Sequence, residues 1–93
     1  MLRLKKTSVA CPEQYDAYDG DKQVGYLRLR HGHFTVRCPD VDGEIVYMTN
    51  PKGDGIFEED ERDRHLRYAV DAIEKWMLVG HPPGPDVRYV IED

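Results

Sequence analysis

Arginine and tyrosine side chains that alternate with apolar residues are the groups in this chain best suited to chemistry. They occur along residues 22–30 and again along residues 33–38. Successive side chains of a β-strand point to opposite faces, so alternation of this kind gathers the polar groups on one face of a sheet. The residues expected to lie together there are Tyr18, Tyr26, Arg28, Arg30, His33 and Arg37.

This face has the chemistry of a platform for a planar or anionic ligand. Guanidinium groups bind phosphate or carboxylate through two parallel hydrogen bonds, and tyrosine rings offer a stacking surface. Arginine and tyrosine also dominate the energetics of protein interfaces. The alternative is a solvated outer face, on which the long side chains only cover the sheet. The sequence leaves both interpretations open.

Other constellations of reactive residues are weaker. His31 and His33 could supply two metal ligands, but a structural zinc site needs four in tight geometry. The acidic turns at 40–44 and 53–60 lack the spacing of a calcium-binding loop. Ser8 is the only serine, and no histidine is placed beside a cysteine in a known catalytic pattern. We therefore expect no catalytic residues, no metal and no cofactor, and an enzyme is not favoured.

Length and composition indicate one small intracellular domain. The 93 residues are 33% charged and 40% hydrophobic, which is typical of a single globular domain. No run approaches the roughly 18 apolar residues of a membrane span, and the basic start of the chain lacks the apolar segment of a signal peptide. Cys11 and Cys38 are expected to be buried thiols, and the location is expected to be cytoplasmic.

The net charge of −5 hides an asymmetry along the chain. Residues 1–38 carry seven Lys/Arg against four Asp/Glu, whereas residues 39–93 carry six against fourteen. Because phosphate neutralisation supplies most non-specific affinity for DNA, nucleic acid is a less favoured partner, although the cationic face could still bind it. The acidic run 54–63 suggests a third function, an inhibitor that imitates nucleic-acid phosphates.

The order of the elements predicts an α+β fold over residues 1–93. Strands are expected at about 14–19, 22–30, 33–38 and 44–49, joined by the short turns Gly20-Asp21, His31-Gly32 and a looser one at 39–43. Three successive hairpins make an antiparallel four-stranded β-meander. The tail 81–93 contains an alternating segment, 86–91, that could add a short edge strand.

One C-terminal helix is expected at about 59–79. Its apolar residues fall three and four positions apart, as on one face of a helix, and they are Leu66, Ala69, Val70, Ile73, Trp76 and Met77. Acidic residues occupy its first turn, and Gly80, Pro82 and Pro83 end it. The stripe must be buried against the leucine side of the hairpins, which leaves the arginine side exposed to solvent.

Three motifs stand out: Tyr15-Asp16-Ala17-Tyr18-Asp19, Val24 to Phe34, and Pro51-Lys52-Gly53-Asp54-Gly55-Ile56-Phe57 with the Glu-Arg-Asp helix opening. They resemble small uncharacterised proteins encoded by phages and prophages. The resemblance spans roughly residues 13–78. It implies an accessory role in a prokaryotic or host cytoplasm, exerted by binding a host factor or ligand. It provides no site residues.

Together these patterns predict a non-enzymatic binding protein of phage or mobile-element type. Its partner would be a host protein or a small anionic ligand, engaged through Tyr18, Tyr26, Arg28, Arg30 and Arg37. No membrane partner is expected. Tyr89-Val90-Ile91 is a candidate edge for self-pairing, so a homodimer is left open.

Overall fold

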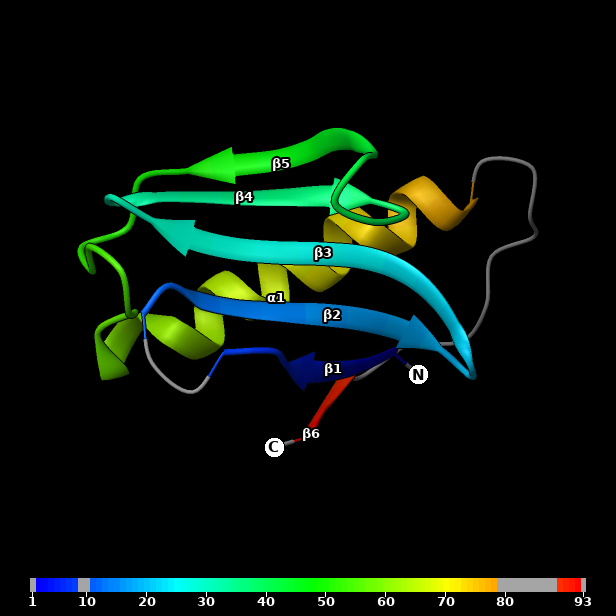
Figure 1. The fold of residues 1–93 in the computed structure, drawn as a ribbon, viewed down its shortest axis with the longest axis horizontal. Coiled ribbons are helices and arrows are strands. Elements are labelled where there is room, and N and C mark those ends of the chain that lie inside the picture. Colours follow the sequence, from blue (N-terminus) through cyan, green and yellow to red (C-terminus); the bar gives the residue numbers. More distant parts are fainter. Residues whose placement is uncertain (1, 9–10, 79–88, 93) are drawn as a thin grey trace.

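The computed structural model describes residues 2–8, 11–78 and 89–92. Within these residues six strands form one sheet in the order β5-β4-β3-β2-β1-β6, and one helix packs on it (Figure 1). The elements are β1 (Leu2–Lys6), β2 (Glu13–Asp19), β3 (Lys22–Arg30), β4 (His33–Cys38), β5 (Glu44–Thr49), α1 (Glu59–Leu78) and β6 (Tyr89–Glu92). Strands β1 to β5 are antiparallel neighbours in chain order.

The predicted hairpins are confirmed, and their turns explain their registers. Asp19 pairs with Lys22 across a two-residue turn whose first residue, Gly20, has a φ of +64°. Arg30 pairs with His33 across a turn in which both His31 and Gly32 have positive φ. Positive φ at both central positions gives a turn whose twist matches that of the two flanking strands.

Helix α1 covers one face of the sheet, and the predicted apolar stripe faces that sheet. Figure 1 shows the helix running diagonally behind the strands. Its side chains Leu66, Ala69, Val70 and Ile73 are buried in one cluster with Leu27, Leu29, Phe34 and Val36, while Trp76 and Met77 pack at the margin. The prediction that the helix covers the leucine side of the hairpins is therefore confirmed. No helix in the described ranges is long and apolar enough to cross a membrane.

The number of strands was predicted wrongly. A fifth antiparallel strand, β1, pairs with β2 and buries Leu2 and Leu4 in the core. Only two apolar residues alternate there among basic ones, so the signal in the sequence is short. The suggested edge strand at the C-terminus is present as β6, but it is parallel to β1. The predicted helix stop at residues 80–83 lies outside the described residues.

The expectation for the two cysteines was half wrong. Cys38 is buried in the core and Cys11 is exposed, and both are free thiols. Burial, reinforced by the negative charge of Glu44, raises the pKa of Cys38 to about 11. Cys11 lies just before β2 and Cys38 ends β4, so they occupy opposite ends of the sheet.

Close packing of α1 on β3 requires glycine at position 25. Gly25 is buried opposite Ala17, and a Cβ atom there would lie 2.6 Å from Cδ1 of Ile73. Real carbon atoms do not approach so closely, so any larger residue must displace the helix side chain.

We expect Gly25→Ala to lower the free energy of unfolding by about 1–2 kcal/mol, because it overpacks the contact between β3 and α1. Ile73→Val removes the Cδ1 atom, so the same glycine substitution should cost about 1 kcal/mol less in that background. Urea unfolding of the two single variants and the double variant measures the coupling. Strictly additive losses would show that the two positions do not clash.

Candidate functional site

The sheet face opposite α1, called the open face from here on, carries the predicted cationic and aromatic cluster. Its residues alternate with the buried leucines and aromatic residues of β3 and β4. Register places Tyr26 beside Arg37, Arg28 beside Thr35 and Arg30 beside His33. The structure therefore brings together all the predicted residues of β3 and β4 on one surface.

Part of the open face is hollowed at the end nearest the β3–β4 turn. The hollow is open to solvent, has a volume of about 340 Å³ and is lined by Arg28, Arg30, His31, His33 and Thr35. Every one of these side chains can donate a hydrogen bond, and two are permanently charged. The lining is therefore suited to an oxyanion.

Arg28, which lines this hollow, has a buried donor without a partner. Its Nε is buried and makes no hydrogen bond to any described residue. A buried donor without an acceptor is costly, so it favours an acceptor that comes from outside the chain. Nearby, Arg30 Nε donates to His31 Nε2 at 3.3 Å, and His33 Nδ1 lies 3.2 Å from Asn50 Oδ1. The first contact joins two neighbours at the β3–β4 turn, and the second joins the start of β4 to the residue that follows β5.

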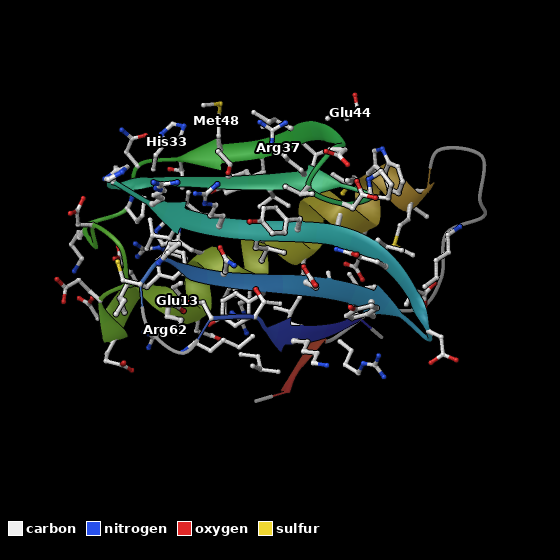
Figure 2. All side chains as sticks on the ribbon, viewed as in Figure 1. Glu13, His33, Arg37, Glu44, Met48 and Arg62 are labelled. Carbon is white, nitrogen blue, oxygen red and sulfur yellow. The ribbon has the colours of Figure 1, made fainter. Side chains whose placement is uncertain are left out.

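The remaining predicted residues lie farther along the open face. Arg37 donates from a terminal guanidinium nitrogen to the carbonyl of Gly43 at 3.0 Å, so part of its fork is already used. The hydroxyl of Tyr26 lies 3.4 Å from Gln14 Oε1. Tyr18 pairs with Gln23 near the opposite end of β3, which separates it from the hollow. Figure 2 labels His33, Arg37 and Met48 on this side of the molecule.

Charge on the open face is mostly positive. On β1 to β5 its cationic residues are Arg3, Lys5, Arg28, Arg30 and Arg37, and its one acidic residue is Asp16. Partial burial raises the pKa of Asp16, although Lys5 and Tyr18 act in the opposite direction. The guanidinium of Arg3 lies 5.2 Å from the centre of the Tyr18 ring, a cation–π distance.

Two buried carboxylates, which the sequence did not reveal, fix the segment 50–58 to the sheet. The first is Glu13, at the start of β2. It accepts hydrogen bonds from the Tyr15 hydroxyl at 2.5 Å, the Phe57 amide at 3.0 Å and Arg62 Nε at 2.9 Å (Figure 2). Burial alone would raise the pKa of Glu13, but these donors lower it overall. The same pairing raises the pKa of Arg62.

The second buried carboxylate is Glu61, in the first turn of α1. It accepts hydrogen bonds from the backbone amides of Lys52 and Gly53, both at 2.8 Å, and from that of Glu58 at 3.0 Å. Burial acts to raise the pKa of Glu61, yet these three donors and the nearby His65 hold it at about 2. His65 is itself buried, stacked on Phe57 at 5.4 Å between ring centres.

This anchored segment is also bonded to the β3–β4 turn beside the hollow. The carbonyl of Asp54 accepts a hydrogen bond from the amide of Gly32, in the β3–β4 turn, at 2.5 Å. The carbonyl of Gly55 accepts one from the amide of Glu13 at 2.7 Å. The turn that carries His31 is thus joined to the core through the segment that Glu13 and Glu61 hold.

The acidic run 54–63 is largely occupied by contacts within the chain. Glu61 is buried, Asp60 pairs with Lys52 at 2.7 Å, and Glu59 pairs with Arg62 at 2.5 Å. Asp63 lies 3.6 Å from Arg67. Their charge is partly neutralised by these pairs, but Glu59, Asp60 and Asp63 stay exposed, so an inhibitor that acts through this run stays a prediction from the sequence.

Over the residues that the structure describes, no group of three or more His, Cys, Asp or Glu side chains is placed to hold a metal ion. Comparisons of the chain with protein-family models, with curated proteins and with solved structures find no match. The resemblance to phage-encoded proteins therefore stays a prediction from the sequence.

We expect Glu61→Gln to lower the free energy of unfolding by about 1–3 kcal/mol at neutral pH, because an amide nitrogen cannot accept from the backbone donors. The pKa of Glu61 is lower in the folded chain than its ordinary 4.5, so its stabilisation is complete above that pH and is lost as the pH falls toward about 2. The variant should therefore approach the parent protein in stability as the solution is acidified. Urea titrations at a series of pH values measure this.

Glu59→Gln is the matched control for this experiment. Glu59 is on the same helical turn and its side chain is 90% exposed, so its loss should change stability by less than about 0.5 kcal/mol. If the cost of Glu61→Gln did not vary with pH, the carboxylate charge would not be what holds segment 50–58.

Proposed function

We propose that this protein is a non-enzymatic binding module whose open face binds an anionic group, with the hollow on β3 and β4 as the centre of the site. The ligand would be a phosphate- or carboxylate-bearing small molecule or an anionic segment of a protein partner. Arg28 and Arg30 would bind its oxygens, and His33 and Thr35 would supply further hydrogen-bonding groups.

The observation that carries this proposal is the buried, unpaired Nε of Arg28 at the hollow. An incoming oxyanion would place a negative charge between two guanidinium groups, and a small shift of the Arg28 side chain would give its buried Nε an acceptor. Hydrogen bonds between charged partners are roughly twice as strong as neutral ones. Five cationic residues against one acidic residue on strands β1 to β5 also favour the approach of an anion.

The surrounding open face supports a role for the two tyrosines and Arg37 at the margin of the site. Tyr26 and Arg37 are cross-strand neighbours, one pleat away from Arg28. They would contact a ligand that extends beyond its anionic group. Tyr18 would be reached only by a ligand that follows β2 and β3 along their length.

We expect inorganic phosphate and pyrophosphate to shift the amide NMR signals of residues 28–35 in the folded protein. Arg28→Gln together with Arg30→Gln should weaken this binding by about tenfold or more, because it removes two charged donors. The matched control is Arg64→Gln with Arg67→Gln, two exposed arginines of α1 whose replacement changes the net charge equally. An equal loss in both double variants would mean that net charge, and no site, governs binding.

A single-stranded nucleic acid is the second candidate ligand, since cations and tyrosines extend over several strands of the open face. Its binding would weaken steeply with salt, by about 0.7 in log affinity per log salt for each phosphate neutralised. An oligonucleotide that engages Arg28, Arg30 and Arg37 should give a slope near −2. Fluorescence anisotropy over a salt series measures it. A slope near zero, with phosphate still bound, would exclude nucleic acid as the ligand.

A further inference from the structure

Strand β5 combines a free edge with an apolar surface on both of its faces. In the described part of the chain it pairs on one side only, with β4. On the open face Ile45 is 42% exposed and Met48 is 53% exposed. On the other side, a groove of about 660 Å³ lies between β5 and α1 and is lined by aromatic residues that include Tyr47, Tyr68 and Trp76. An edge of this kind is a template for pairing with another strand.

A bulge gives β5 an unusual pattern of faces. Arg37 pairs with Ile45 and Val36 with Tyr47, so Val46 is an extra residue. Ile45 and Met48 consequently both lie on the open face although they are three positions apart. Val46 and Tyr47 both pack toward the helix side, and so does Glu44, which accepts a hydrogen bond from Trp76 Nε1 at 3.1 Å.

This pattern matches itself in one antiparallel register. If two copies pair about a two-fold axis between Val46 and Tyr47, Ile45 lies opposite Met48 of the second copy, and both are on the open face. Val46 then meets Tyr47 and Glu44 meets Thr49, all on the helix side. Shifting the register by one residue in either direction sets open-face residues against helix-side residues, which a shared sheet does not allow.

From this self-match we infer that β5 is a homodimer interface, in which two chains join their sheets edge to edge through β5. Each copy's Val46 would lie beside the other's Tyr47 at the mouths of the two grooves and help to shield the aromatic side chains there. The open faces would form one continuous surface, with Ile45 and Met48 covered at the seam. This inference is independent of the proposed anion site.

Two aromatic residues of α1 lie against β5 on the side that the second copy would help to cover. Glu44, the first residue of β5, accepts a hydrogen bond from Trp76, and the ring of Tyr47, next to the proposed axis, lies 6.3 Å from that of Tyr68 between centres. The second copy's Val46, opposite Tyr47, would therefore lie close to these aromatic side chains.

The first test is sedimentation equilibrium of the full chain over about 1 μM to 1 mM protein, a range that covers weak to moderate dimers. We expect a dimer whose dissociation constant rises at least tenfold in Met48→Lys. The matched control is Ile56→Lys, because Ile56 is 49% exposed and lies outside β5, in the segment before α1. A monomer throughout the range, or equal weakening by both variants, would overturn the interface.

The second test reads the register directly by disulfide formation in a Cys11→Ser background, which removes the exposed native thiol. Paired residues of neighbouring strands lie about 4.5–5.5 Å apart at Cα, within reach of a disulfide. We expect an equimolar mixture of Ile45→Cys and Met48→Cys chains to form cross-linked dimers much faster than either chain alone. Equal rates in the three samples would overturn the register, even if the protein is a dimer.

Discussion

Two carboxylates buried without loss of charge are the constraint on which the rest of this structure depends. Glu13 and Glu61 are each 1% exposed, and each collects hydrogen bonds from segment 50–58. That segment has to carry the chain from the edge strand β5 back across the sheet to the start of α1. Phe57 is buried in the core, but most of the other residues of the segment are polar or glycine, so apolar burial alone does not fix its path. The two carboxylates hold the segment in place, because a buried charge is stable only when it is hydrogen-bonded, and the backbone amides of the segment are among its donors.

The division of the sheet into two chemically different faces follows from strand alternation with two interruptions. Alternation places leucine and aromatic residues under α1 and leaves arginine on the open face. Register shifts at Ala17/Tyr18 and at Val36/Arg37 then break strict alternation. They allow Val24 and Val46 to turn toward the helix as extra residues. The second shift also leaves Ile45 and Met48 on the same face.

Local patterns in the sequence were enough to predict most of the elements but not the contacts between distant ones. The three hairpins and the helix carry strong signals, because turn residues and apolar spacing act over a few positions. Strand β1 was missed because five residues with two leucines resemble a basic terminal segment. The pairing of Glu13 with Arg62 was out of reach for a different reason. It joins residues 49 positions apart, and nothing near Glu13 marks it as buried.

In the candidate site, too, the sequence predicts which residues share a face but not how their side chains are held. Alternation predicted that Arg28, Arg30 and His33 share a face, and the β4 pairing sets them side by side. The hollow itself, and the unpaired Nε of Arg28, depend on how the neighbouring side chains are held. Arg37 was grouped with them by the same rule, but its fork is partly used by the carbonyl of Gly43. The alternation pattern alone gives Arg28, Arg30 and Arg37 the same role, whereas the hydrogen bonds of the structure distinguish Arg37 from the other two.

The β3–β4 turn connects the buried carboxylates Glu13 and Glu61 to the open face. The amide of Gly32 bonds to Asp54, and Asp54 belongs to the segment that Glu61 and Glu13 hold in place. Rigid side chains bind a ligand more tightly because less conformational entropy is lost. The positions of His31 and His33, beside the hollow, are therefore set in part by two glutamates that no ligand on the open face would touch. Stability of the core and geometry of the site are linked in this small domain because the same segment of backbone serves both.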